Sequence, residues 1–446
     1  MDENQLEDIA KLARGSGADT VEVLYVNSTD ITAGVRLGKQ EALERSEHSA
    51  VGLRVWVGKQ QAMVSSDDVN TNNLHALIEN ATDMAKASPA DPHAGLAPRE
   101  SWANNTPDLE LQDTQEPDIS TLQTSCHEAE EAAMAVNGVT NSDGARADYG
   151  YQALSLFIAP TDGNPFFGHY QTTHYGLSVS VLAGEGTAME EDYEYSTKRF
   201  MADLPDAATM GKKAGQRVIT RLNPQSIPTC QLPIIWDKRV GKSLLSNFLS
   251  AINGNAVARG SSFLKDKMNQ PIFDQTVHII DDPSIKRGLA SRPFDGEGVA
   301  GRTLNLVEGG VLKHWLLSMR SANQLSLQSN GRASRGLSSP PSPSSTNCYI
   351  QAGSISPEDM LTGVERGLYV TDIFGMGVNG VTGDYSQGAR GFLIEGGTIT
   401  TPINEITIAG NLIDMFAQLT PANDLHFEYG INVPTLRVDG MTVAGS

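Results

Sequence analysis

The chain has 446 residues, of which 39% are hydrophobic, and no apolar run approaches the roughly 20 residues that a membrane-spanning helix needs. Its 53 acidic and 33 basic residues give a formal net charge of −20, which disfavours binding to nucleic acid or to anionic membranes. The acidic first residues lack the basic and apolar regions of a secretory signal, so we expect a cytoplasmic protein. Cys126, Cys230 and Cys348 lie far apart, which favours reduced thiols over a disulfide framework.

The first predicted unit, residues 1–98, is an α+β domain in which an antiparallel meander lies between two helices. Its expected strands alternate or run apolar with many β-branched side chains, and its second helix carries apolar side chains at helical spacing. The helices are expected at residues 5–14 and 69–86, and the strands at residues 20–26, 31–37, 49–57 and 61–65.

The second predicted unit, residues 118–224, is again α+β and follows a proline-punctuated crossing segment. The third unit, residues 230–446, is mostly β with few helices, and its Gly-Gly pairs at 309–310 and 396–397 favour tight turns between strands. The fold class is therefore α+β. Helices are expected at residues 119–136, 207–222, 238–252, 318–325 and 357–367, and strands of the second unit at residues 147–158, 168–183 and 187–195.

Two segments of the third unit invite a functional interpretation. Ser386 lies in Gly383-Asp-Tyr-Ser-Gln-Gly388, which has one residue too many for a Gly-x-Ser-x-Gly nucleophile elbow, so a turn serine is the simpler interpretation. The loop at residues 330–347 combines two arginines, many hydroxyls and several prolines. It either holds an extended peptide through main-chain hydrogen bonds or is a passive surface loop.

Neither metal-like motif in the first two units predicts a bound ion. Cys126-His-Glu offers only the first two letters of a His-Glu-x-x-His helix, so an exposed acidic helix face is expected there. The acidic run Glu190-Glu-Asp-Tyr-Glu194 lacks the glycine-punctuated loop of a calcium site. We therefore expect a solvated strand end at that run.

Several ordered blocks of the sequence resemble the TldD/PmbA family of metallopeptidases, most closely its PmbA branch, also called TldE. The resemblance extends over nearly the whole chain. The blocks include Pro293-Phe-Asp-x-Glu-Gly-Val299, the run from Gly383 through Gly397, Glu405-Ile-Thr-Ile-Ala-Gly-Asn-Leu412 and the closing Pro434-Thr-Leu-Arg-Val-Asp-Gly-Met-Thr-Val443.

The resemblance implies a cytoplasmic complex in which TldD and TldE subunits pair, cleave unfolded peptides and mature small precursors such as microcins. The older name, modulator of DNA gyrase, does not imply DNA contact. In the TldD branch, a helix with His-Glu-x-x-x-His and a later cysteine holds the metal. The corresponding positions here are Leu245, Ser246 and Ser250, which offer no good zinc ligand or general base. We therefore expect no catalytic residue or metal in this chain, and zinc in a TldD-like partner.

The resemblance also suggests which residues of this chain lie at a peptide cleft. Part of the 330–347 loop is similar to the family's loop beside the substrate cleft, and the glycine-rich run is expected to frame a cleft or a subunit interface. The candidate peptide-cleft residues are Asn330, Gly331, Arg332, Thr346, Asn347, Asp384 and Tyr385.

Two other functions remain open from the sequence. The chain is either part of such a complex or a homodimeric peptide-binding module that does not cleave its ligand. A third hypothesis is an independent hydrolase centred on Ser386, with Asp384 nearby.

Overall fold

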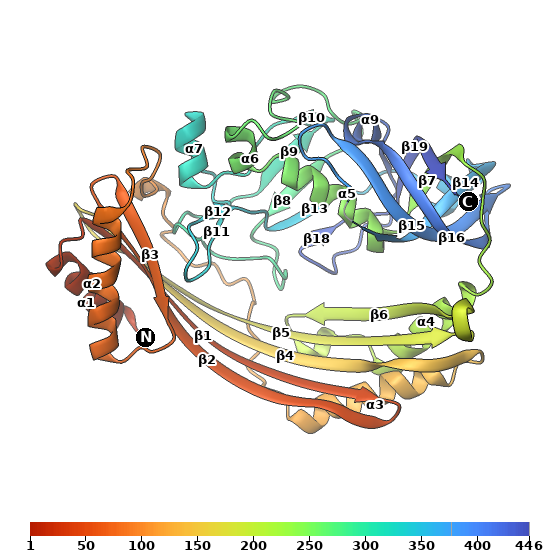
Figure 1. The fold of residues 1–446 in the computed structure, drawn as a ribbon, viewed down its shortest axis with the longest axis horizontal. Coiled ribbons are helices and arrows are strands. Elements are labelled where there is room, and N and C mark those ends of the chain that lie inside the picture. The colour runs from red at the N-terminus through yellow and green to blue at the C-terminus, as the bar shows by residue number, and fades with distance from the viewer. Residues whose placement is uncertain (376, 446) are drawn as a thin grey trace.

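One long, curved sheet of six strands forms the first layer of the computed structural model, which describes residues 1–375 and 377–445 (Figure 1). All its neighbouring strands are antiparallel, in the order β3-β2-β1-β4-β5-β6. The strands are β1 (Thr20–Arg36), β2 (Lys39–Val57), β3 (Gln60–Ser66), β4 (Val139–Ala159), β5 (Phe166–Ala183) and β6 (Glu190–Lys198).

Two pairs of helices cover the outer face of this sheet. Helices α1 and α2 pack against one end, where β1, β2 and β3 supply the apolar side chains, and α3 and α4 pack against the other end (Figure 1). Because β1 of the first unit pairs with β4 of the second, the predicted units 1–98 and 118–224 share one continuous sheet. The helices are α1 (Glu3–Gly15), α2 (Thr71–Ala87), α3 (Ile119–Met134) and α4 (Ala207–Thr220).

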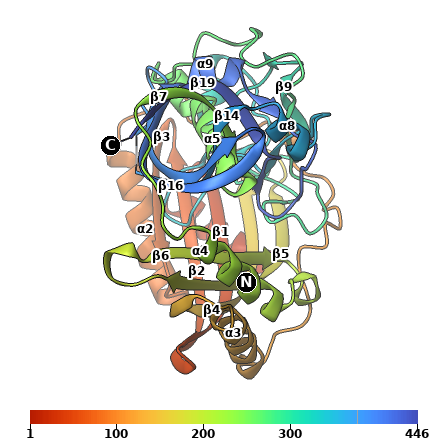
Figure 2. The same cartoon turned by 90° about the vertical axis from the view of Figure 1, so that its right-hand side faces the viewer.

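The described part of the C-terminal region contains two larger sheets, and the six-stranded one closes on itself. Strand β16 pairs with β15 on one side and also with β19, which gives the ring of strands visible in Figure 2. This sheet has the order β16-β15-β14-β7-β19-β17, and the other has the order β10-β9-β8-β13-β18. The strands are β7 (Cys230–Trp236), β8 (Ile279–Asp282), β9 (Leu304–Glu308), β10 (Val311–Leu312), β13 (Asn347–Ile350), β14 (Arg366–Phe374), β15 (Asp384–Glu395), β16 (Thr398–Asn411), β17 (Thr420–Pro421), β18 (Ile431–Asn432) and β19 (Leu436–Ala444).

Five helices accompany the strands in what the structure describes of this region, so the mixed α+β class and the predominance of strands in the third unit are confirmed. They are α5 (Lys238–Ala251), α6 (Gly254–Ala258), α7 (Met319–Leu325), α8 (Pro357–Thr362) and α9 (Leu412–Ala417), and a small ladder joins β11 (Ala333–Ser334) to β12 (Ser342–Pro343). Among the described residues, no helix is long and apolar enough to cross a bilayer.

The glycine pairs do form hairpin turns. Gly396 and Gly397 have φ angles of +54° and +76° and join β15 to β16, where Glu395 faces Thr398 across the turn. Two successive positive φ angles define a type I′ turn, which side chains larger than glycine or asparagine rarely adopt. The run from Gly383 through Gly397 therefore contains a strand and the turn of a hairpin, as the Gly-Gly pair at 396–397 predicted.

The predicted break between strands 20–26 and 31–37 is wrong. Asn27 to Asp30 look like a turn in the sequence, yet β1 continues through them as one strand of 17 residues. These residues pair with β2 on one side and with β4 on the other. Ladder hydrogen bonds on both edges outweigh the weak strand preference of these side chains.

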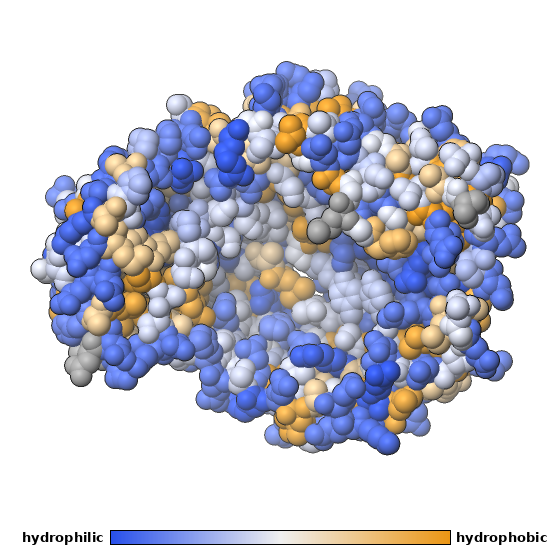
Figure 3. Space-filling view, viewed as in Figure 1, coloured by the Kyte–Doolittle hydropathy of each residue, from blue (hydrophilic) through white to orange (hydrophobic). Residues whose placement is uncertain are grey.

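The C-terminal region contacts the concave side of the first sheet. Trp102, Phe166 and Phe294 form an aromatic cluster between the layers, with ring centroids 5.7 Å and 5.4 Å apart for the two contacts of Phe166. Between these layers the surface is hollowed near the middle of the molecule (Figure 3).

Candidate functional site

Helix α5 (Lys238–Ala251) forms where the sequence predicted a helix at residues 238–252. Asp237 precedes it, and its Oδ1 accepts a hydrogen bond of 2.8 Å from the backbone N–H of Arg239, which satisfies a free donor of the first turn. The apolar stripe faces the core of the C-terminal region. Its buried members are Val240, Leu244, Leu245, Phe248, Leu249 and Ile252.

The three positions that correspond to a metal-binding motif do not fit a zinc ion. Leu245 is buried in the core and has no donor atom. The Ser246 hydroxyl donates to the carbonyl of Lys242 at 3.0 Å, and the Ser250 hydroxyl donates to the carbonyl of Ser246 at 2.9 Å. Both hydroxyls thus bond to their own helix. Within residues 1–375 and 377–445, no group of three or more His, Cys, Asp or Glu side chains is arranged to hold a metal.

One turn before Leu245, helix α5 is linked to the edge strand of the first sheet. Lys242 Nζ donates a hydrogen bond of 2.5 Å to the hydroxyl of Tyr195 in β6 and lies 4.1 Å from the ring centroid of Tyr429. The two tyrosine rings stack with centroids 5.2 Å apart. Burial raises the pKa of Tyr429, so this ring is neutral at ordinary pH. The cation and the two rings bridge the layers beside α5.

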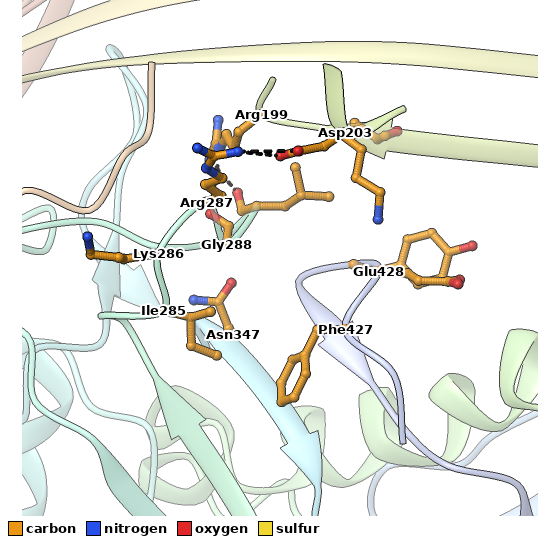
Figure 4. Close-up of a pocket in the computed structure, with 13 residues that line it drawn as sticks. Arg199, Asp203, Ile285, Lys286, Arg287, Gly288, Asn347, Phe427 and Glu428 are labelled. Carbon is orange, nitrogen blue, oxygen red and sulfur yellow. Dashed lines mark hydrogen bonds and ion pairs between the residues drawn. The ribbon is translucent and has the colours of Figure 1, made fainter. Parts of the chain in front are cut away.

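Two neighbouring cavities lie beside these rings. The larger, of about 310 Å³, is enclosed by the end of β6, the 285–289 loop, the 427–429 segment and Asn347 (Figure 4). The second, of about 250 Å³, extends along β6 toward α4. Both include Lys198, Asp203, Glu428 and Tyr429 in their walls, so they form one discontinuous groove between the layers.

The predicted loop residues are brought together, but most of their side chains face inward. Arg332 is 0% exposed and donates to Asp281 Oδ1 at 2.5 Å, and the Thr346 hydroxyl donates to the same oxygen at 2.5 Å. Asn330 accepts from the N–H of Leu317 and donates to the carbonyl of Trp315. Gly331, with φ of +73°, connects Asn330 to Arg332. These residues fix the loop from inside, and contact with a peptide by them stays a prediction.

Asn347 is the loop residue that lines a cavity. Its Oδ1 accepts from the N–H of Ala290, and its Nδ2 donates to the carbonyl of Asp282 and the hydroxyl of Ser291, each at 2.7 Å. These bonds hold the 285–291 segment, which forms one wall of the larger cavity.

Asp384, Tyr385 and Ser386 are the first three residues of β15, in the glycine-rich hairpin. Tyr385 is 2% exposed and packs edge-on against Trp236, and its hydroxyl is buried without a partner among the described residues. Asp384 accepts from the Thr382 hydroxyl at 2.6 Å. Ser386 is exposed on β15, and within the described part of the chain its side chain has no hydrogen bond to a histidine or a carboxylate. A serine without a base is a poor nucleophile.

The acidic run in β6 is not a solvated strand end, contrary to the prediction. Asp192 is 2% exposed and accepts from Arg221 Nε at 2.5 Å and from Arg239 Nη1 at 3.2 Å. Arg221 and Arg239 lie after α4 and in α5, far along the chain, so the sequence gives no local sign of this pairing. The pair with Arg239 joins β6 of the first sheet to α5 of the C-terminal region, and the pair with Arg221 joins β6 to the end of α4.

The sequence reasoning also missed the basic wall of the larger cavity. Arg199 and Arg287 both line it, and Arg287 pairs with Asp203 across it at 2.9 Å (Figure 4). The available signal was two adjacent basic pairs, Lys198-Arg199 and Lys286-Arg287, in a chain with a net charge of −20. The separation of the two pairs along the sequence does not predict that they meet in the folded chain.

Family models match almost the entire chain. The PmbA/TldA metallopeptidase domain 1 matches residues 21–85, the central domain matches residues 112–222, and the C-terminal domain matches residues 229–445. The chain therefore belongs to the PmbA/TldA metallopeptidase family, as the sequence blocks indicated.

Within this family the chain is similar to PmbA-type members. It is 33% identical to Metalloprotease PmbA of Escherichia coli O157:H7, over 99% of this chain and 96% of the relative. It is also 33% identical to the Metalloprotease PmbA homolog of Haemophilus influenzae, over 98% and 94% of the two chains.

Solved structures confirm the fold. A putative modulator of DNA gyrase from Bacteroides thetaiotaomicron superposes with a TM-score of 0.90 at 25% identity, over 100% of both chains. TldE from Thermococcus kodakarensis has the same fold, with a TM-score of 0.87 at 20% identity over 99% of this chain and 100% of that one. A Metalloprotease TldD homolog from Buchnera aphidicola is 22% identical over 65% of this chain and 66% of the relative.

Proposed function

We propose that this chain is the PmbA/TldE-type subunit of a cytoplasmic TldD/TldE-like metalloprotease complex. In this complex it carries no zinc of its own, pairs with a TldD-like subunit that does, and helps to hold unfolded peptides and small peptide precursors of the microcin type.

Helix α5 is the observation that carries this proposal. It keeps its cap, its buried stripe and its place in the core, whereas Leu245 is a core residue and Ser246 and Ser250 bond to helix carbonyls. A subunit with this helix helps to shape the peptide site of the complex and supplies no Lewis acid. The cavities between β6 and the C-terminal region support a role in holding peptide.

Metal analysis of the purified chain tests the proposal directly. We expect less than about 0.1 zinc per chain and no peptidase activity for the chain by itself, because the hydroxyl and alkyl side chains at the three positions are poor zinc ligands. Stoichiometric zinc together with peptidase activity that a chelator removes would overturn the proposal.

Co-purification from the native cell separates the complex from a solitary peptide-binding homodimer. We expect a partner that carries His-Glu-x-x-x-His, and mixing the two purified subunits is expected to restore peptide cleavage. A chain that elutes only as a homodimer and binds peptides without such a partner would favour the binding module instead. Turnover by the isolated chain that Ser386→Ala abolishes would favour the hydrolase.

A further inference from the structure

Arg199 is a buried guanidinium with no carboxylate partner among the described residues. It is 8% exposed, lines the larger cavity and donates only to backbone carbonyls, those of Thr173 at 3.0 Å, Leu289 at 2.6 Å and Gly288 at 3.4 Å. Burial lowers its pKa to about 10. A buried charge is costly unless an opposite charge compensates it, and a guanidinium has five N–H donors, of which these contacts use three.

The same cavity contains more positive than negative charge. Lys198, the neighbour of Arg199, forms no ion pair within the described part of the chain. Lys286 and Arg287 also line the cavity and share Glu110, at 2.5 Å and 2.9 Å. Four basic side chains thus meet three acidic ones, Asp203 and Glu428 of the cavity wall and Glu110 behind it.

This local excess opposes the charge of the whole molecule. The chain has a net charge of −20, so its general field repels anions, and a cavity wall with a net positive charge is a local exception. A single carboxylate in the cavity would balance this excess of one positive charge without having to displace Asp203 from Arg287.

The rest of the wall suits a peptide. Ile285, Phe427 and Tyr429 contribute apolar and aromatic surface, and the volume of about 310 Å³ is at the lower end of the range for ligand pockets. Figure 4 shows Phe427 across the cavity from Arg199 and Arg287, and Ile285 on the same loop as Arg287. One group of a ligand can therefore contact cations while its neighbour contacts apolar side chains.

We propose that this cavity binds a carboxylate group of a peptide, with Arg199 and Lys198 as its cationic partners and Ile285 and Phe427 beside the adjoining side chain. The proposal rests on the proposed function, because a peptide is the ligand whose carboxylate is assigned to the cavity. A carboxylate occurs in a peptide at its C-terminus or in an acidic side chain, and the test separates these sources.

Calorimetric titration of the full-length chain with three N-acetylated peptides tests the assignment. All three share a neutral, partly aromatic sequence; one ends in a free carboxylate, one in an amide, and one in an amide with a single internal glutamate. We expect a carboxylate peptide to bind at least about tenfold more tightly than the neutral amide, which corresponds to about 1.4 kcal/mol. Whether the free acid or the glutamate peptide gains the advantage identifies the source.

Variants locate the effect in the cavity. Lys198→Gln is expected to reduce the carboxylate advantage, the ratio of the affinities for the carboxylate peptide and the neutral amide, to less than about threefold. Lys212→Gln, which removes an exposed lysine of α4 outside both cavities, is the matched control and should retain the full advantage. Arg199→Lys keeps the charge but loses the fork geometry, so an intermediate value is expected.

Two results would overturn the inference. Equal or absent binding of all three peptides would show that the cavity does not select a carboxylate. A tenfold advantage that Lys198→Gln leaves intact would place the carboxylate elsewhere. Neither result touches the zinc content or the partner of this chain, so the proposed function is tested separately.

Discussion

Arg335 Nη1 donates a hydrogen bond of 2.5 Å to the carboxylate of Glu22, across 313 positions of sequence, and both side chains are 2% exposed. The same carboxylate oxygen lies 3.4 Å from Arg54 Nη1, and Arg54 in turn covers the ring of Trp56 at 4.2 Å. One buried carboxylate of the first sheet therefore holds a guanidinium of its own sheet and one of the C-terminal region. This contact joins the first sheet to the C-terminal region.

Glu22→Gln is expected to lower the free energy of unfolding by about 3–5 kcal/mol, because it leaves two buried guanidinium groups without their counterion. Urea denaturation followed by tryptophan fluorescence measures the change. Glu116→Gln is the matched control, since its partner Arg45 is 43% exposed and an exposed ion pair contributes at most about 1 kcal/mol. Equal losses in the two variants would contradict a structural role for the buried pair.

Glu297 predicts a decline in stability toward alkaline pH. Burial, together with the nearby Asp295 carboxylate, raises its pKa from 4.5 to about 8 in the folded protein. The folded state therefore keeps a proton that the unfolded state releases. The resulting contribution of Glu297 to the free energy of unfolding is complete below about pH 4.5 and is lost as the pH rises to about 8.

Glu297→Gln is the variant that tests this pH dependence. It should flatten the fall in the free energy of unfolding between pH 5 and pH 8, by up to about 1 kcal/mol per pH unit, because the amide has no proton to release. Denaturant titrations at four pH values check it, with Glu308→Gln at an exposed strand end as control. An unchanged slope in Glu297→Gln would exclude this carboxyl as the source.

Gly52→Ala is expected to separate the first sheet from the 330–347 loop. A Cβ atom at position 52 would lie 2.3 Å from the carbonyl oxygen of Leu337, and a backbone oxygen cannot rotate away. We expect a loss of about 1–3 kcal/mol in stability and faster proteolysis of the loop. Gly15→Ala, at the end of α1 with nothing within 4 Å, should be neutral or slightly stabilising.

The three thiols should differ in reactivity. Burial raises the pKa of Cys126 to about 11 and raises that of Cys348 well above its ordinary value, whereas Cys230 is only partly buried. A thiol-specific reagent should therefore modify about one cysteine per native chain and three after unfolding, because the thiolate is the reactive form. Cys230→Ser should remove the native reaction. Rapid modification of Cys126 or Cys348 in the folded protein would contradict their burial.

Local patterns were sufficient to predict many of the elements. The stripe and cap of α5, and the Gly396-Gly397 turn between β15 and β16, depend on residues within a few positions of one another. The family blocks, too, are contiguous stretches of sequence, which is why the family followed from the sequence.

Interactions between distant residues decided the rest. The polar residues of β1 stay in a strand because β2 and β4 pair with both edges, and Asp192 is buried because Arg221 and Arg239 meet it from other elements. Arg332 turns inward because it forms an ion pair with the buried carboxylate of Asp281.

The sequence by itself thus determined the family, the α+β class and the side chains at the degenerate metal positions of α5. Only the tertiary structure decided which charged side chains are buried and which of them line the groove, because burial and ion pairing depend on chain segments that meet only after folding. Arg199 is the clearest case. It is buried in the cavity wall and has no carboxylate partner among the described residues, and its sequence neighbours indicate neither fact.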